Sequence, residues 1–153
     1  MEPRGEGPVT WSSRTVLLAL VLWLAAGAAG AQEKPRIDVD LMVSHISDAA
    51  GGVDARGEAL HAKLQREFRY ESLRVLESRS LQLGLDEVGT VNLPNGKRAR
   101  IRPLQLGENG VLLAVDVEGS VQTDLRVRNG HLVVIGAERY QDGKLVISLE
   151  PHW

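Results

Sequence analysis

The second half of the chain, residues 88–149, consists of alternating apolar and polar positions that are interrupted by two-residue turn signals. In a type I′ β-turn both central residues have a positive φ, which Asn, Asp and Gly tolerate better than other residues. Such pairs predict two-residue hairpins at four places: Asn95-Gly96, Asn109-Gly110, Asn129-Gly130 and Asp142-Gly143. This half of the chain is therefore expected to form antiparallel strands.

Apolar residues at every second position predict eight or nine strands, because successive side chains of a strand point to opposite faces. Residues 110–118 differ from the rest, since almost every position is apolar and both faces are expected to be buried. The pattern leaves the boundary between the second and third strands open. The expected strands cover residues 37–46, 69–77, 80–85, 88–93, 97–104, 110–118, 121–128, 131–136 and 144–149.

One helix is expected between the first two strands. Leu60, Leu64 and Phe68 recur at helical spacing, and Asp54 is placed to cap a helix that runs to about Phe68. Many strands with turn signals between them, and one helix near the start, predict a mainly β (α+β) fold. We expect an antiparallel β-sandwich or a small open barrel of about eight strands, with the helix covering one sheet face.

The N-terminal segment has the order of a secretory signal peptide. Arg14 precedes an uninterrupted apolar run over residues 15–29, and small residues end at Ala31. Fifteen helical residues rise only about 22 Å, short of the ~30 Å hydrocarbon core of a bilayer. Residues 1–31 are therefore expected to be a signal peptide cleaved after Ala31. An uncleaved anchor is the alternative, because Glu2 and Glu6 balance the basic residues of the segment.

Cleavage would leave a short linker, residues 32–36, and a single β-rich domain, residues 37–153. The net charge of −2 does not change on cleavage, so nothing in the charge balance requires nucleic acid as a partner. The chain has no cysteine, which excludes disulfides and thiolate chemistry. Export without disulfides favours a bacterial envelope, and we expect a periplasmic or extracellular protein.

No catalytic or metal-binding motif is present in the sequence. His45, His61, His131 and His152 match no zinc spacing, and nucleophile elbows, phosphate loops and dinucleotide fingerprints are missing. The sequence therefore predicts a protein that is not an enzyme and that has no metal and no cofactor.

Two carboxylate pairs keep a different function open. Asp38 with Asp40, and Asp116 with Glu118, would each share a strand face at a separation of about 7 Å. That spacing overlaps what glycosidic acid–base chemistry requires, so a glycan-binding protein or a hydrolase is the alternative function. Alternating carboxylates are also typical of any solvent-exposed strand face. Sugar sites usually contain aromatic platforms, and aromatic residues are scarce here.

The most distinctive surface feature is basic. Alternate positions of the strand at 97–104 carry arginine, and a second short ladder ends the strand at 121–128. If the two strands are neighbours, their cations form one patch that can bind an anionic surface. Alternatively, the arginines protect a sheet edge, which Pro103 favours. The residues of this candidate binding face are Lys97, Arg98, Arg100, Arg102, Arg126 and Arg128.

Taken together, these patterns predict a non-enzymatic exported β-domain that acts as a binding or structural module of the bacterial cell envelope. Its expected partner is an envelope protein or an anionic envelope surface, and contact with the membrane is expected only if the N-terminal segment stays uncleaved. By analogy with other small sandwiches, an adaptor role in a secretion, pilus or motility assembly is the more specific expectation.

Overall fold

The computed structural model describes residues 33–153, and residues 34–153 form one compact unit. The expected signal peptide, residues 1–31, lies outside the described residues. Within them, no helix has both the length and the apolar character needed to cross a membrane. The elements are β1 (Arg36–Ser47), β2 (Gly52–Val53), α2 (Glu58–Leu64), β3 (Ser72–Gly84), β4 (Gly89–Asn92), β5 (Arg98–Gly107), β6 (Gly110–Val117), β7 (Val121–Val127), β8 (Val133–Tyr140) and β9 (Gly143–His152).

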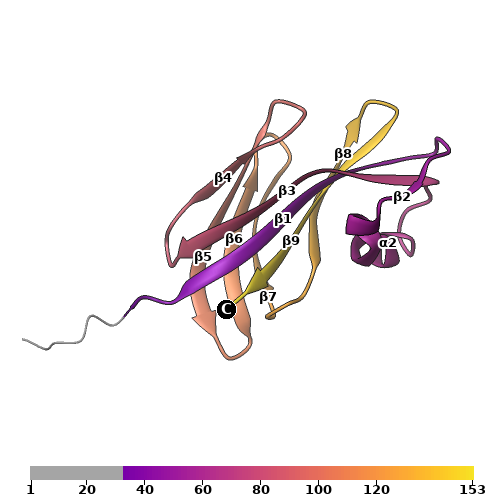
Figure 1. Cartoon of the computed structure of the whole chain (residues 1–153). Helices are drawn as coiled ribbons and strands as arrows, with labels where there is room; N and C mark the ends of the chain where they lie inside the picture. Colours follow the sequence, from indigo (N-terminus) through magenta and orange to yellow (C-terminus); the bar gives the residue numbers. More distant parts are fainter. Residues whose placement is uncertain (1–32) are drawn as a thin grey trace, which may run out of the picture. The chain divides into compact units, whose positions relative to one another are not determined.

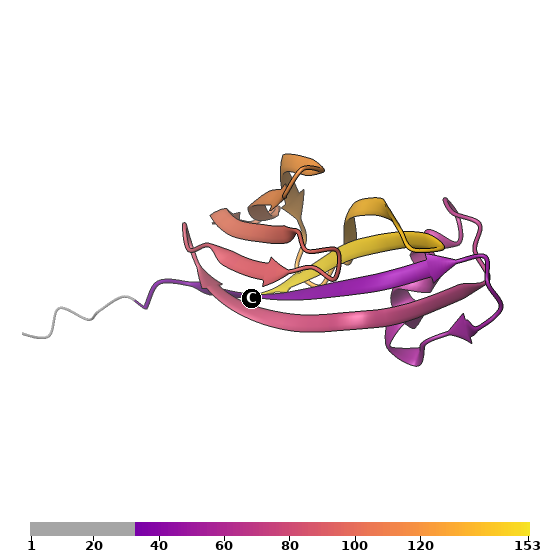
Figure 2. The same ribbon diagram turned by 90° about the horizontal axis from the view of Figure 1, so that it is seen from above.

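The strands form two sheets that pack face to face as a sandwich (Figures 1 and 2). The sheet with the order β2-β3-β1-β9-β8 is called the long sheet here, and the sheet with the order β4-β5-β6-β7 is called the short sheet. All pairs are antiparallel except β2 with β3. The predicted β-rich fold with one helix is confirmed, as a sandwich and not as a closed barrel.

The main core lies between the two sheets and follows the predicted alternation. Ile37, Val39 and Leu41 of β1 are fully buried, as are Leu145 and Leu149 of the neighbouring strand β9. They meet the inward side chains of β5 and β6 across the sandwich. Burying each such side chain contributes about 1.5 to 3 kcal/mol, so this core is the main source of stability.

A second apolar cluster lies on the opposite face of the long sheet, under α2 (Figure 2). Leu60 and Leu64 of the helix pack there against Leu73 of β3 and Val146 of β9. The helix is shorter than predicted, because a 3₁₀ turn precedes it and the chain leaves helical geometry after Leu64 to reach β3. Asp54 caps the 3₁₀ turn instead of α2, since its carboxylate accepts the backbone N–H of Arg56 at 3.1 Å, whereas the N-cap of α2 is Gly57.

The second and third expected strands are one strand, β3, with a β-bulge in it. Val43 of β1 pairs with Glu77 but the next residue pairs with Val75, so Leu76 is the extra residue and is 39% exposed. The bulge changes which positions face which side. Before it, Leu73 and Val75 face α2, whereas the later apolar residues face the sandwich core. Because of the extra residue, the packed apolar positions of β3 are odd-numbered on both sides of the bulge although they face opposite sides of the sheet.

The prediction of four type I′ hairpins is wrong in its geometry. Three of the pairs do lie at hairpins, but Asn129-Gly130 lies in the connection that crosses from β7 in the short sheet to β8 in the long sheet. In each Asn-Gly pair only the glycine has a positive φ. At the β8–β9 turn the residue with a positive φ is Gln141, whose φ is 50°. A further hairpin, between β6 and β7, turns at Gly119 and was not predicted. Longer or mixed turns tolerate the same residues, so these pairs locate turns without defining their type.

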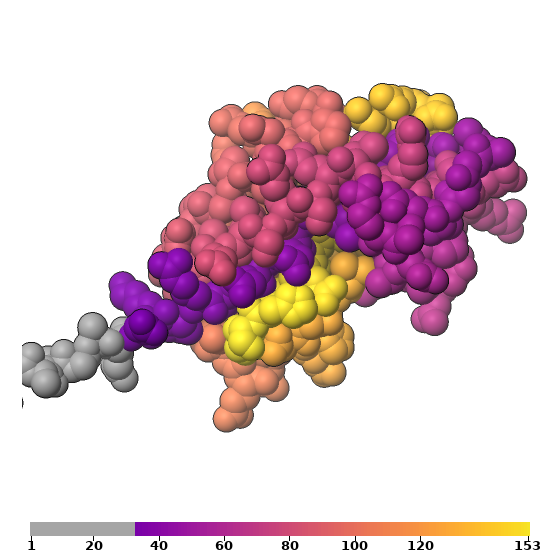
Figure 3. Space-filling model, viewed as in Figure 1, coloured from indigo at the N-terminus to yellow at the C-terminus, as the bar shows by residue number. Residues whose placement is uncertain are grey.

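The C-terminal strand lies beside β1 in the middle of the long sheet. Asp38 near the start of β1 pairs with His152 near the end of β9, so both ends of the domain lie at the same end of the sheet. Figure 3 shows the C-terminal residues in yellow against the indigo first strand. The long sheet therefore forms only when the last residues of the chain are in place.

Replacing Leu60 by Ala is expected to lower the free energy of unfolding by about 2 to 5 kcal/mol, because it leaves a cavity between α2 and the long sheet. Urea denaturation followed by circular dichroism measures this loss. Arg66→Ala, an exposed control in the turn after α2, is expected to change stability by less than about 0.5 kcal/mol. Equal losses in both variants would contradict the packing role of the helix.

Candidate binding face

The predicted basic residues lie on the outer face of the short sheet, with one exception. Arg98, Arg100 and Arg102 alternate along β5 with buried inward residues, and all three are exposed. Arg126 lies on β7 and is also exposed, and the exposed Arg128 follows the end of that strand. Strand β6 lies between β5 and β7, so the two ladders share a face but are not neighbours.

Lys97 is the exception, because its side chain does not lie on the outer face and instead links the two sheets. Its Nζ lies 2.9 Å from Oε2 of Glu138 on β8, and the Asn95 amide donates to the same oxygen at 3.3 Å. The Ser120 hydroxyl, and then the Lys97 ammonium, hold the pKa of Glu138 below its ordinary value, whereas burial acts in the opposite direction. The Lys97–Glu138 pair is thus a link between the short and long sheets.

Two arginines of β5 form ion pairs with carboxylates of the β6 side. Arg98 Nε lies 3.3 Å from Glu118, and Arg100 Nη1 lies 3.2 Å from Asp116. The hydrogen bond from Arg98 lowers the pKa of Glu118. The predicted patch of six cations is therefore wrong: the face carries charges of both signs, arranged by the register of neighbouring strands.

Arg126 is satisfied by uncharged groups. Its Nη2 donates to Gln105 at 3.2 Å, and its Nη1 donates to the carbonyl of Gly110 at 3.4 Å. Gln105 and Arg126 lie on the two strands that flank β6, so this bridge spans the face at the end farthest from Arg98.

Ala114, the smallest side chain of β6 on this face, lies between Arg102 on β5 and Asp124 on β7. A hollow of about 260 Å³ is found at this place, and both charged residues line it. Among residues 33–153, neither Arg102 nor Asp124 forms an ion pair or a side-chain hydrogen bond. The expectation that residues 110–118 are buried on both faces is wrong here, because Ala114 is only partly buried.

The alternative that the arginines protect a sheet edge holds for only part of β5. Strand β4 pairs with β5 from Arg98 to Ile101, so the first half of β5 is a central strand. Beyond Ile101 this side of β5 has no β4 partner, and Pro103 lies there, next to a register shift. A residue without an N–H is tolerated where no ladder bond is needed.

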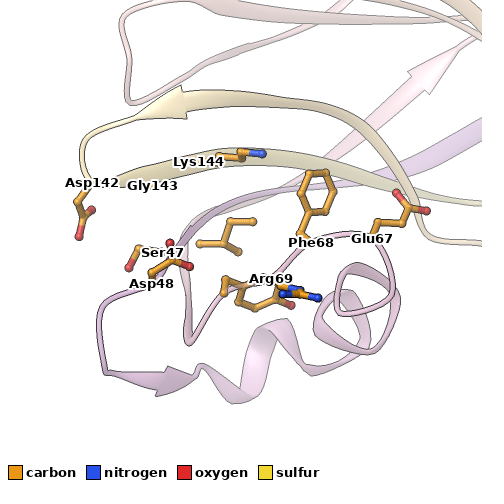
Figure 4. A pocket seen from close by; sticks show the side chains of 10 residues that line it. Ser47, Asp48, Glu67, Phe68, Arg69, Asp142, Gly143 and Lys144 are labelled. Carbon is orange, nitrogen blue, oxygen red and sulfur yellow. The ribbon is translucent and has the colours of Figure 1, made fainter.

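A cleft that the sequence did not predict lies at the α2 end of the long sheet (Figure 4). Its volume is about 280 Å³, and it lies between the β8–β9 turn and the segment that follows α2. In Figure 4, Phe68 points towards the strand that carries Lys144, whose Nζ lies 4.8 Å from the ring centroid. Asp48, Arg69 and Asp142 add charges of both signs to the walls. These residues come from three segments that are distant in the sequence, so no local spacing connects them.

The wall formed by the segment after α2 is held by a bond between His61 and Tyr70. His61 Nδ1 lies 2.7 Å from the Tyr70 hydroxyl, and the two rings meet edge to face. Burial raises the pKa of Tyr70 above its ordinary value. A second hollow, of about 440 Å³, shares Phe68 and Tyr70 with the first.

The histidines do not come together. His45 is almost fully buried, with its ring edge to face against Tyr140, and its Nε2 lies 3.1 Å from Asp142. His152 lies on the exposed face of the long sheet, beside Asp40. Within the part of the chain that the structure describes, no group of three His, Cys, Asp or Glu residues is placed to hold a metal ion.

The carboxylate pairs do not line a pocket with an aromatic residue. Asp116 and Glu118 are engaged by arginines, and the lining of the hollow beside Asp116 has no aromatic side chain among residues 33–153. Asp38 and Asp40 lie on the exposed polar face of the long sheet. No observation on these residues favours the glycan-binding or hydrolytic alternative.

Comparison of the chain with protein-family models, with curated proteins and with solved structures finds no match in any of the three. The class that the structure defines for residues 33–153 is a two-sheet β-sandwich with one short α-helix.

Replacing Glu138 by Gln is expected to lower the free energy of unfolding at neutral pH by about 1 to 3 kcal/mol, because Asn95 and Lys97 lose a charged acceptor. The folded-state pKa of Glu138 is lowered from 4.5, so the stabilising contribution of the ionised carboxylate is complete above that pH. It is lost as the pH falls through the lower folded-state pKa.

Urea denaturation of both proteins between about pH 3 and pH 7 should therefore show a stability difference that narrows below pH 4.5. Glu108→Gln, at an exposed position of the β5–β6 turn, is the matched control and should show no such change. A difference that stays constant over the whole range would show that the charge of Glu138 does not stabilise the link between the sheets.

Proposed function

We propose that the domain is a non-enzymatic binding module of the bacterial cell envelope and that it binds a partner protein through the outer face of the short sheet. The observation that carries the proposal is the arrangement of β5, β6 and β7. Exposed arginines and carboxylates face outward on three adjacent strands, and a hollow lies between them.

The charge pattern of this face suits specific recognition. Arg98 and Arg100 are oriented by carboxylates on the next strand, so the partner meets ordered charges of both signs instead of a uniform basic patch. Complementary charges at an interface increase association rates and exclude wrong partners more than they add affinity. Such a surface favours one partner over many anionic ones.

The dimensions of the face also support the proposal. At normal strand spacing and rise, the three strands β5, β6 and β7, of about eight residues each, and the shorter β4 give a surface of roughly 450 Å². This is a little more than half of the ~800 Å² that one partner contributes to a standard interface. The face can thus form more than half of a binding surface without help from the α2 end of the molecule.

The cellular part of the proposal comes from the sequence. The charged, apolar and small residues of the N-terminal segment support export, and the absence of cysteine supports a bacterial envelope. An adaptor role in a secretion, pilus or motility assembly is the more specific form of the proposal, and it is an analogy with other small sandwiches.

Neutralising the β5 ladder is expected to remove the partner. In affinity purification from envelope extract, the triple variant Arg98→Gln, Arg100→Gln, Arg102→Gln should lose at least about 90% of the proteins that the unchanged domain retains specifically, since the ordered charges set specificity. Quantitative mass spectrometry measures the loss. Thermal unfolding of the same variant confirms that the fold is intact.

The matched control removes the same charge from exposed arginines elsewhere, as Arg66→Gln, Arg74→Gln, Arg139→Gln. This variant is expected to retain the partners. If both triple variants lose the same proteins, total charge and not the face is responsible, and an anionic surface is then the better partner. Retention by the β5 variant would remove the outer face from the proposal.

Export predicts a defined mature protein. Cleavage after Ala31 gives a chain of residues 32–153, and intact-mass measurement of the protein recovered from its own cells should show that mass. A mass equal to the whole chain would instead support the uncleaved anchor.

A further inference from the structure

One cross-strand row of the outer face keeps its opposite charges apart. In the row of Arg100 and Asp116 the charges are in contact at 3.2 Å. In the next row, Arg102 faces Ala114 and Ala114 faces Asp124, so a methyl group separates the cation from the carboxylate. Two strand spacings place the backbones of Arg102 and Asp124 about 9.6 Å apart.

The hollow lies in this row because Ala114 is small. Its walls are Arg100 and Arg102 on the β5 side and Gln122 and Asp124 on the β7 side. Its volume of about 260 Å³ is too small for most drug-sized ligands but is enough for one or two side chains of a partner. The hollow is thus basic at one end and acidic at the other.

We infer that this hollow receives a zwitterionic element of the partner protein, with a carboxylate at Arg102 and an ammonium or guanidinium at Asp124. The inference rests on the proposed function and names its recognition chemistry. The Arg102 guanidinium presents a fork that matches a carboxylate, and Asp124 accepts bonds from a cation. A partner element with two negative charges would be repelled by Asp116 and Asp124. An element with two positive charges would be repelled by Arg100 and Arg102.

The probe for this site is 6-aminohexanoate, which carries a carboxylate at one end and an ammonium at the other. The matched probes contain the same five methylenes: pimelate, with two carboxylates, and 1,5-diaminopentane, with two ammonium groups. Each is titrated into the isotope-labelled mature protein at low salt and followed by amide resonances of β6 and β7. Only the zwitterion is expected to give saturable shifts around Ala114, with a millimolar dissociation constant, because exposed ion pairs are weak.

Four single variants localise the site. Arg102→Gln, Asp124→Asn and Ala114→Leu should each weaken binding of the zwitterion by about five-fold or more, the last by filling the hollow. Arg139→Gln, at an exposed position on β8 that does not line the hollow, should leave binding unchanged. The charge-swapped double variant Arg102→Asp, Asp124→Arg should restore binding, because the probe can then enter in the reverse direction.

Several results would overturn the inference. Equal binding of pimelate or of the diamine would show that only charge density matters. A shift of the Arg102 Nε–H resonance on Asp124→Asn in the free protein would show that these two charges pair with each other and need no ligand.

The experiments can refute the inference and the proposed function independently of each other. If the β5 triple variant loses the partner but the zwitterion does not bind, the outer face remains the binding surface and the chemistry inferred for the hollow is wrong. If the zwitterion binds but the triple variant retains all partners, the hollow is a small-ligand site and the proposed protein interface is wrong.

Discussion

The structure depends on the pairing of β1 with β9 in the middle of the long sheet. β1 supplies Ile37 and Leu41 to the sandwich core on one face and Ile46 to the cluster under α2 on the other. At the far end of this pairing the backbones come so close that any side chain at Gly143 would overlap the carbonyl of Ile46. Because β9 is the last strand, the two cores and both surfaces described above exist only after the whole domain has folded.

The long strands also separate the two surfaces described above. β1, β3 and β9 extend beyond the short sheet and carry α2 on their opposite face (Figures 1 and 2). One end of the molecule therefore presents the flat, charged outer face of the short sheet, whereas the other end presents the cleft beside Phe68 and Lys144. A partner on the outer face leaves that cleft accessible.

The outer face shows how two separate sequence features become one surface. In the sequence, the arginines of residues 98–102 suggest an anion-binding patch, and Asp116 with Glu118 suggests a catalytic pair. The register of β5 with β6 places the arginines opposite the carboxylates. The two kinds of group neutralise each other in pairs, so the face is neither uniformly basic nor a site of unpaired carboxylates. In the row at Ala114, the small side chain leaves the charges of Arg102 and Asp124 apart, so these two charges do not neutralise each other.

By itself, the sequence determined most of the strands and most of the side chains that point outward, because alternation is a local property of a strand. The exposure of Arg98, Arg100 and Arg102 follows from the apolar residues between them, and the turn residues locate most connections. Only the tertiary structure decided that Arg100 meets Asp116, that Lys97 leaves the face to bind Glu138, and that a cleft forms at the α2 end. Strand order and register arise from contacts between distant segments, and no local pattern encodes which of the many compatible pairings buries the core best.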